Sequence, residues 1–358
     1  MGLTLMAATE SFRLLEFIMD NMIAKAEGSV RVDLLGGTLD IVPLNQVLRH
    51  TITLNLATSL KAKVKVEEIE FEGVEFVSVD YDSVTRHSSV EFTYEDFDSD
   101  TFGALSFLAQ ILHHFKLTSG IRLTTESGSP PGAGLGGSSS MGVTVYKALC
   151  DYCGVEFHRQ TAINTVQNIE AKILNKGPCG YQDYYPALYG GVLALKATNS
   201  CIEVEQLYNE EFKSFVESHL TLVYSGQLRL SAINNWQVYK DFFDNQNGVR
   251  EGLGKIRDLT FSAYNAIRNG EYDDFLGMLC QEGAQREKLF SGIVTDDMRD
   301  IYNKLREKDL VIGMKVCGAG GGGCFLLAHG PQHKSQVLKE LARVKDMQVL
   351  EFSVEKPL

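Results

Sequence analysis

Pro130-Pro131-Gly132-Ala133-Gly134-Leu135-Gly136-Gly137-Ser138-Ser139-Ser140 is a glycine-rich segment between a predicted strand at residues 121–125 and a predicted helix at residues 141–153. Glycines let a backbone adopt positive φ and approach a ligand closely. The helix that follows begins with free N–H groups and the positive end of its dipole, which together bind anions. The three serines add hydroxyl groups that can reach a phosphate oxygen or Mg²⁺. The segment therefore predicts a phosphate-binding loop, with a tight turn capped by serines as the alternative.

The same segment contains the dinucleotide-binding pattern G-x-G-x-x-G, at Gly132, Gly134 and Gly137. An acid, Glu156, follows about 20 residues further on, as such a site requires. A dinucleotide fold would place a strand before that acid, whereas residues 151–158 read as a turn into the next helix. The Walker motif G-x-x-x-x-G-K-[ST] and the protein-kinase motifs H-R-D and D-F-G do not occur in the sequence. NAD binding, a Walker-type loop and a protein-kinase site are therefore disfavoured.

A second glycine-rich segment, Gly318-Ala319-Gly320-Gly321-Gly322-Gly323, lies between predicted strands at residues 314–317 and 323–329. Five glycines in six residues cost conformational entropy on folding. Such a segment is expected where a ligand or another backbone must come very close. A hairpin of closely packed backbones is the alternative to a ligand site here.

Two acidic residues follow rigid turns elsewhere in the chain. Arg31-Val32-Asp33-Leu34-Leu35-Gly36-Gly37-Thr38-Leu39-Asp40 reads as a strand that carries an arginine and ends in a Gly-Gly turn. The acid beyond that turn, Asp40, suits the hydroxyl groups of a polyol, with an Asx-turn residue as the alternative. Asp183 ends the segment Gly177-Pro178-Cys179-Gly180-Tyr181-Gln182-Asp183, which follows a predicted helix containing Glu170. An acid held by a Gly-Pro turn could accept a proton from an attacking hydroxyl.

Strand and helix patterns follow one another irregularly along the chain. A β-rich region comes first, with alternating or β-branched residues at 29–35, 51–67, 68–79 and 89–94. Helical patterns follow at 102–115, 160–174, 249–269, 272–289 and 296–307. Shorter elements are expected as a strand entered within 185–194, a strand at 220–225, a helix at 337–345 and a strand at 348–354. This mixture lacks a regular βαβα order and predicts an α+β fold. Apolar periodicity fades near residues 210–217, which predicts two domains, residues 1–215 and 216–358.

The chain has 358 residues and a net charge of −12, which argues against nucleic acid as a partner because phosphate backbones need basic surfaces. ATP is not excluded, because backbone N–H groups, a metal ion and a few local cations can hold it. Seven cysteines, an odd number, and the lack of a secretory signal predict reduced thiols in the cytoplasm. Residues 12–23 predict an amphipathic helix that is too short to span a bilayer, so no membrane segment is expected. That helix would pack on the body of the protein or on a partner chain, which leaves a homodimer open.

In their order along the chain, the four segments resemble those of the GHMP kinases, the family of galactokinase, homoserine kinase, mevalonate kinase and phosphomevalonate kinase. The middle segment is similar to the family's P-x-x-G-L-G-S-S motif, with Gly137 where the first serine usually stands. Residues 318–323 are similar to its third motif, and the resemblance spans residues 29–329. It implies an N-terminal domain like the second domain of a small-subunit ribosomal protein and a ferredoxin-like C-terminal domain. ATP would lie in the cleft between them.

The resemblance also implies roles for individual residues. Ser138 matches the serine that ligates Mg²⁺, and Glu170 matches the acid that shares the metal. Asp183 matches the catalytic aspartate, and Arg31 matches an arginine beside the transferred phosphoryl group. Asp40 matches the acid that holds sugar hydroxyls in galactokinases. Pro131 to Ser140 would form the phosphate-binding loop. Gly36, Gly37, Gly320 and Gly321 would complete the substrate site.

One departure from the family pattern bears on the substrate. Galactokinases carry Glu-His after the first glycine of the first motif, whereas this chain has Gly37-Thr38. The Gly-Gly variant and the pair Gln182-Asp183 are more similar to the heptose-phosphate and fucose kinase branch, which phosphorylates the anomeric hydroxyl. Arg229 would then meet a sugar hydroxyl or a phosphate already on the sugar. A mevalonate-type or galactokinase-type enzyme and a non-catalytic sensor of sugar or nucleotide are the alternatives.

Overall fold

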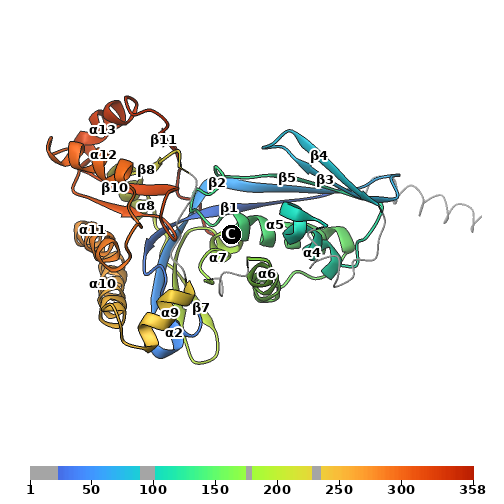
Figure 1. Ribbon diagram of the computed structural model, residues 1–358, viewed down its shortest axis with the longest axis horizontal. Coiled ribbons are helices and arrows are strands. Elements are labelled where there is room, and N and C mark those ends of the chain that lie inside the picture. Colours follow the sequence, from blue (N-terminus) through green and yellow to red (C-terminus); the bar gives the residue numbers. More distant parts are fainter. Residues whose placement is uncertain (1–22, 89–100, 175–179, 228–234) are drawn as a thin grey trace, which may run out of the picture.

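The computed structural model describes residues 23–88, 101–174, 180–227 and 235–358 (Figure 1). The strands are β1 (Ile23–Leu35), β2 (Ile52–Glu68), β3 (Gly73–Ser78), β4 (Ser83–Ser88), β5 (Ile121–Glu126), β6 (Val192–Ala197), β7 (Ile202–Gln206), β8 (Leu220–Tyr224), β9 (Gly313–Val316), β10 (Cys324–Ala328) and β11 (Gln348–Val349). The α-helices are α2 (Leu44–Val47), α4 (Ser106–His114), α5 (Gly137–Cys153), α6 (Arg159–Leu174), α7 (Tyr185–Tyr189), α8 (Glu210–His219), α9 (Asn235–Phe243), α10 (Val249–Asn269), α11 (Tyr272–Leu289), α12 (Asp296–Arg306) and α13 (Lys334–Leu341), with short 3-10 turns at Gly103–Leu105 and Pro331–His333. The predicted strand at 89–94 lies outside the described residues, as does the predicted opening helix except for Ile23, where β1 begins.

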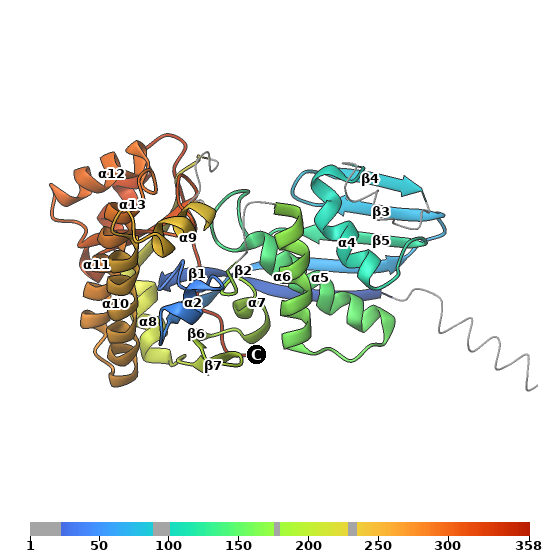
Figure 2. The same ribbon diagram turned by 60° about the horizontal axis from the view of Figure 1, so that its bottom comes forward.

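Seven strands form the first sheet, in the order β4-β3-β5-β2-β6-β7 with β1 paired to β2. β1 and β2 run antiparallel over almost their whole length, from the pair Ile23–Glu67 to the pair Leu35–Leu54. Helices α4, α5, α6 and α7 cover one face of this sheet (Figures 1 and 2). Their buried side chains, such as Val145 and Leu149 of α5, form one apolar core with the sheet.

The second sheet has four antiparallel strands in the order β11-β8-β10-β9. All five residues of β10 are buried, which is expected of a short continuous apolar run covered on both faces. Helices α12 and α13 lie on one side of this sheet and α10 and α11 on the other (Figure 1). Val30, Val32 and Leu34 of β1 share one buried cluster with Leu326 of β10, so the two sheets are joined by a common core.

The strands of the first sheet all come from residues 23–206 and those of the second from residues 220–349, which confirms the predicted α+β class. The predicted domain boundary between residues 215 and 216 falls inside α8, between the last strand of one sheet and the first of the other, and it stays a prediction. In the parts of the chain that the structure describes, no helix combines the length and apolar character needed to cross a membrane.

The sequence placed most elements correctly, and the strand expected to begin within residues 185–194 does begin there, at Val192, but the helix before it was not predicted. This apolar stretch forms the helix α7 before the chain enters β6. A short apolar run fits a buried strand and a buried helix equally well. Pro186 stands in the first turn of α7, where its missing N–H is not needed, and Gly190 ends the helix with φ of 62°. The C-terminal helix also begins earlier than predicted, at Lys334, and the closing strand is limited to Gln348–Val349.

Candidate active site

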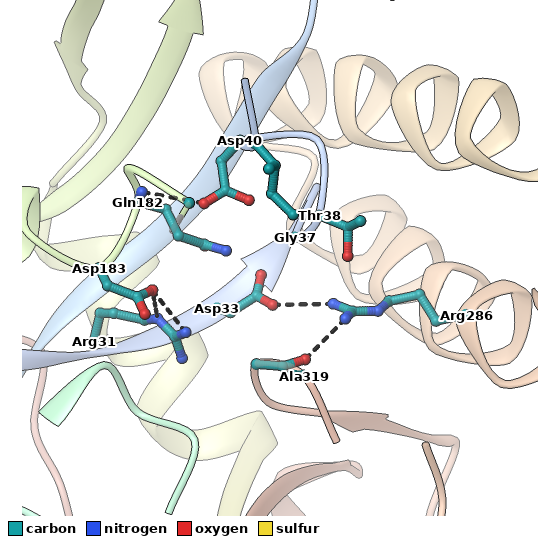
Figure 3. A pocket seen from close by; sticks show the side chains of 12 residues that line it. Arg31, Asp33, Gly37, Thr38, Asp40, Gln182, Asp183, Arg286 and Ala319 are labelled. Carbon is teal, nitrogen blue, oxygen red and sulfur yellow. Dashed lines mark hydrogen bonds and ion pairs between the residues drawn. The ribbon is translucent and has the colours of Figure 1, made fainter. Parts of the chain in front are cut away.

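A cavity of about 130 Å³ lies where β1 and the turn after it meet the loop at residues 180–183, helix α11 and the second glycine-rich segment (Figure 3). Its lining includes five charged side chains, Arg31, Asp33, Asp40, Asp183 and Arg286. Three of the five come from the predicted substrate and catalytic residues. The cavity therefore gathers segments that are far apart in the sequence.

Arg31 links β1 to the predicted catalytic aspartate and to the first glycine-rich segment. Its Nε and Nη2 lie 2.9 and 2.8 Å from Asp183 Oδ1. Its backbone N–H donates to the Leu135 carbonyl at 3.0 Å, and its guanidinium also donates to the Gly134 carbonyl. Arg31 is only 2% exposed, whereas the Asp183 side chain is 28% exposed. The arginine is thus a fixed buried group, and the carboxylate that it holds remains accessible from the cavity.

The glycine-rich segment leads directly to this pair. Gly136, with φ of 70°, immediately precedes α5, and a Cβ added to it would lie 3.1 Å from Asp183 Cβ. The N–H groups of the first turn, Gly137 to Ser139, have no carbonyl partner within the helix and are available to an anion. The N-terminal end of α5, which the sequence predicts to bind phosphate, is therefore next to the Arg31–Asp183 pair.

The predicted metal ligands lie under the same helix end. Glu170 of α6 is 5% exposed and accepts hydrogen bonds from Ser139 Oγ at 2.8 Å and from the Tyr184 hydroxyl at 2.7 Å. Burial raises the pKa of Glu170, while hydrogen bonds from Tyr184, Ser139 and Ser138 partly oppose that shift. Ser138 is exposed at the surface of the turn. Tyr184 is thus a neighbour of Glu170 that the sequence did not single out, and the hydroxyl of Ser139, predicted to reach a phosphate or Mg²⁺, donates to Glu170 instead.

Other residues of the first segment hold it in place. Ser140 is buried, and its hydroxyl donates to the carbonyls of Gly28 and Ser29, at 3.2 and 3.0 Å. These contacts favour a structural role for Ser140 over the predicted phosphate contact. The Ala133 carbonyl accepts the N–H of Cys324 at 2.7 Å, and the Pro131 carbonyl accepts the Tyr224 hydroxyl at 3.3 Å. The segment is therefore clamped between the two sheets.

The second glycine-rich segment packs on the first. Gly323 has φ of 77°, and a Cβ there would lie 2.7 Å from the Gly132 carbonyl oxygen. The alternative of closely packed backbones therefore applies at Gly323, although the partner is the first segment and not a hairpin. Gly320 and Gly321 were predicted to contact substrate, but Gly320 packs against Ile293 and the Gly321 N–H donates to the Ile293 carbonyl. The cavity is bounded instead by the first two residues of the segment, Gly318 and Ala319.

Asp40 lies over the cavity on the turn that follows β1. It is 2% exposed and its Oδ2 accepts the N–H of Gln182 at 3.2 Å. Burial, and after it the neighbouring charge of Asp183, raise the pKa of Asp40 from 3.8 to about 7. Gly180 is needed beside it, because a Cβ there would come within 1.9 Å of Asp40 Oδ2. Thr38, in the same turn, has φ of 77°, which β-branched residues rarely adopt, so its surroundings must hold this turn in place.

Gly36 and Gly37 differ in their roles within that turn. Gly36 has φ of 82° and packs against the Ile52 carbonyl, so it shapes the turn and does not line the cavity. Gly37 lines the cavity, and a Cβ added to it would lie 2.5 Å from Asp33 Oδ2 and 2.6 Å from Arg286 Nη1. Gly37 therefore makes room for an ion pair that the sequence did not predict.

Two models of one protein family, one for its N-terminal domain and one for its C-terminal domain, match this chain. GHMP kinases N terminal domain matches residues 102–191, and GHMP kinases C terminal matches residues 263–346. The chain belongs to the GHMP kinase family. The resemblance read from the four segments and the two-domain fold implied by it are both confirmed.

This GHMP kinase is 27% identical over 228 residues to the L-fucokinase/L-fucose-1-P guanylyltransferase of Bacteroides fragilis, an alignment that covers 62% of this chain and 24% of that protein. The chain thus spans about a quarter of the length of that relative. It is 26% identical over 275 residues to the D-glycero-alpha-D-manno-heptose 7-phosphate kinase of Campylobacter jejuni, which covers 75% of this chain and 78% of that one. Its fold is similar to the crystal structure of a D-glycero-D-manno-heptose 1-phosphate kinase from Bacteroides thetaiotaomicron, with 20% identity and a TM-score of 0.71 over 94% of this chain and 97% of that chain.

The GHMP kinase motifs did not reveal a cluster of four buried charged residues, Asp33, Glu282, Arg286 and Lys315. Asp33 Oδ2 lies 3.2 Å from Arg286 Nη1 and 3.2 Å from Lys315 Nζ. Lys315 Nζ is also 3.3 Å from a carboxylate oxygen of Glu282. One signal was present, because Asp33 is two residues from Arg31 on the same strand and so on the same face. Nothing in the sequence around Glu282, Arg286 or Lys315 indicated that their side chains meet it.

Some predicted residues cannot be placed. Arg229, Gly177 and Pro178 lie outside the described residues. Within the described parts of this GHMP kinase, no three His, Cys, Asp or Glu side chains converge to hold a metal ion. Mg²⁺ in phosphate sites usually has only one or two carboxylate ligands and takes the rest from phosphate and water. The lack of a larger cluster is therefore compatible with the predicted metal position at Ser138 and Glu170.

Proposed function

We propose that this GHMP kinase transfers the γ-phosphoryl group of ATP to a hydroxyl of a sugar. The observation that supports it most is the Arg31–Asp183 pair directly beside Gly136, with the free N–H groups of α5 on one side and a cavity lined by carboxylates on the other. The first environment suits phosphates and the second suits hydroxyl groups. A phosphoryl donor and a hydroxyl acceptor could therefore meet at Asp183.

The chemistry follows from these positions. The N–H groups at the start of α5 would hold the β- and γ-phosphates. Asp183 would orient the attacking hydroxyl and accept its proton. Arg31 fixes the orientation of Asp183 through two contacts to Oδ1 and brings a positive charge to the place where charge develops on the phosphoryl group. Positioning and neutralisation of charge provide most of the catalysis in this type of reaction.

A Mg²⁺ ion fits the oxygen groups under the helix end. Ser138 offers an exposed hydroxyl, and Glu170 offers a carboxylate that is already oriented by Ser139 and Tyr184. These are hard oxygen ligands of the kind Mg²⁺ takes together with phosphate oxygens. When bound, the ion would neutralise phosphate charge. Ser138 and Glu170 would fix its position relative to α5, and we propose them as its protein ligands.

We propose the anomeric hydroxyl of a hexose or of a heptose phosphate as the acceptor. The names of two similar proteins, one acting on fucose and one on a heptose phosphate, support this range. Asp40 would bind further sugar hydroxyls from its place above the cavity. We also propose that the two catalytic domains divide near residues 215 and 216.

A coupled assay of ADP release tests the function. The substrates are L-fucose, D-galactose, D-mannose, D-glycero-D-manno-heptose 7-phosphate and mevalonate, each with ATP and Mg²⁺. Turnover with at least one sugar that disappears in Asp183→Asn is the expected result. Turnover with mevalonate alone would replace the sugar proposal by a mevalonate-type kinase. ATP binding without turnover on any of them would favour a sensor.

A further inference from the structure

One carboxylate oxygen of Asp33 has no hydrogen-bond partner among the residues that the structure describes. The side chain is fully buried and lines the cavity. Its Oδ2 faces both Arg286 and Lys315 at 3.2 Å, whereas its Oδ1 accepts no hydrogen bond from the described part of the chain. Figure 3 places the Asp33 carboxyl group between the Arg31–Asp183 pair and Arg286, with Asp40 above it. A buried acceptor without a donor is costly, and such groups usually have a functional explanation.

The orientation of this carboxylate is fixed from behind. Arg286 donates to Asp33 Oδ2 and, through Nη2, to the Gly318 carbonyl at 2.8 Å. Lys315 lies between Asp33 and Glu282, at 3.2 and 3.3 Å. Two acids and two bases thus form a neutral buried cluster of residues from β1, α11 and β9. Since both cations approach Oδ2, the other oxygen is left for a donor from the cavity.

The charge state of Asp33 suits an acceptor. Burial opposes its ionisation, but Lys315, Arg286 and Arg31 outweigh burial and hold the pKa of Asp33 below its ordinary value. Burial raises the pKa of the other acid, Glu282, despite the same Lys315 and Arg286. Of the two acids, Asp33 is therefore the one whose surroundings favour the carboxylate.

We propose that Asp33 Oδ1 binds a hydroxyl of the sugar substrate that is not phosphorylated, which makes Asp33 a specificity-determining residue. This inference rests on the proposed function. It also restricts the substrate class, because both arginines of the cavity lining are paired, Arg31 with Asp183 and Arg286 with Asp33. The part of the substrate that enters the cavity beside β1 is then an uncharged polyol, and any phosphate that it carries lies elsewhere.

The experiment compares substrates and variants together. The substrate is whichever of L-fucose, D-galactose, D-mannose and D-glycero-D-manno-heptose 7-phosphate has the highest kcat/KM, and it is tested beside its mono-deoxy forms. In the unmodified enzyme, removal of one particular hydroxyl other than the phosphorylated one should lower kcat/KM roughly 10- to 100-fold. This is the range for a hydrogen bond to a charged group. This loss should appear mainly in KM.

The variants must keep the buried cluster neutral. Asp33→Asn combined with Lys315→Met removes one acid and one base, and the amide oxygen of Asn is expected to face Arg286, so its NH₂ faces the cavity. In that variant the same deoxygenation should change kcat/KM by less than about threefold. Glu282→Gln combined with Lys315→Met is the matched control, because it alters the same cluster behind Asp33 and leaves Oδ1 in place. The control should keep the full deoxy effect.

Each outcome decides the matter. Deoxy effects that are equal in the unmodified enzyme and both variants, or that vanish in both variants, would overturn the role of Asp33 while leaving the sugar kinase proposal intact. Equal deoxy effects in all three proteins are expected if an ordered water, and not the sugar, donates to Asp33 Oδ1. Turnover with no sugar at all would overturn the proposed function, and the inference with it.

Discussion

Arg31 and Asp183 are 152 residues apart in the sequence, yet two nitrogens of the guanidinium lie within 2.9 Å of one oxygen of the carboxylate. The arginine comes from β1, which pairs with β2 in the first sheet, and the aspartate comes from the loop before α7. Both also touch the first glycine-rich segment, Arg31 by hydrogen bonds and Asp183 by its closeness to Gly136. The pair therefore assembles the three segments on which the proposed reaction depends.

Asp183→Asn should lower turnover by about 10²–10⁴, the range for loss of a general base. The change is nearly isosteric, so the protein should still fold, although Arg31 loses its charged partner. Affinity for ATP should stay the same or improve, because a negative charge beside the γ-phosphate is removed. Turnover and the Kd for ATP are measured on the same folded sample. A variant that keeps more than about a tenth of the turnover would remove Asp183 from the catalytic role.

Replacing the serines at the start of α5 one at a time should separate their roles. Ser138→Ala should raise the Mg²⁺ concentration needed for half-maximal rate and leave stability unchanged, because the N–H groups of the turn remain. Ser140→Ala should lower the free energy of unfolding by roughly 1 kcal/mol, because two carbonyls of the first strand region lose their hydroxyl donor. Mg²⁺ titrations and urea unfolding of both variants check this. Full activity of Ser138→Ala at limiting Mg²⁺ would reject Ser138 as a ligand.

Asp40→Asn should act oppositely on stability and on substrate binding. The folded protein keeps the Asp40 proton up to about pH 7, whereas the unfolded chain releases it near pH 3.8. The contribution of Asp40 to the free energy of unfolding is therefore fully present below about pH 4. It is lost as the pH rises from 4 to 7. The variant does not titrate, so its stability relative to the original protein should increase across that window, by at most about 4 kcal/mol.

The sugar KM of Asp40→Asn should increase more at pH 8 than at pH 6, because only the ionised carboxylate is lost as a strong acceptor. The KM for ATP serves as the internal control and should change little. Urea unfolding and kinetics at pH 5, 6, 7 and 8 test both parts. A stability difference that is the same at every pH would show that Asp40 does not titrate in this window.

The sequence predicted the parts of the site that depend on local backbone chemistry. The loop at residues 130–140, the turn at Gly36 and the position of Asp40 all follow from glycines and a helix start, which leave a local signal. It did not predict the cluster around Asp33, because Glu282, Arg286 and Lys315 meet Asp33 only after α11 and β9 pack on β1. No local pattern marks a lysine that will be fully buried. The same limit explains Gly320 and Gly321, which were assigned to substrate although tertiary packing directs them to Ile293.

Gly37→Ala tests whether the Asp33–Arg286 pair needs the glycine beside it. The backbone of Gly37 is outside the left-handed region, so alanine at this position adds no backbone strain. Its Cβ would nevertheless lie 2.5 Å from Asp33 Oδ2 and 2.6 Å from Arg286 Nη1, and both side chains are buried and held on their far sides. Gly37→Ala should therefore lower the free energy of unfolding by about 1–3 kcal/mol and raise the sugar KM.

Gly277→Ala is the matched control for Gly37→Ala. Gly277 lies within α11, and a Cβ added to it would meet no atom within 4 Å. Alanine there should raise the free energy of unfolding by about 0.5–1 kcal/mol, because glycine weakens a helix interior. Urea unfolding of both variants, with sugar kinetics on each, gives the comparison. If Gly37→Ala were as stable as the original protein and bound sugar equally well, Asp33 and Arg286 would have room to move apart, and the ion pair would not be what requires glycine at position 37.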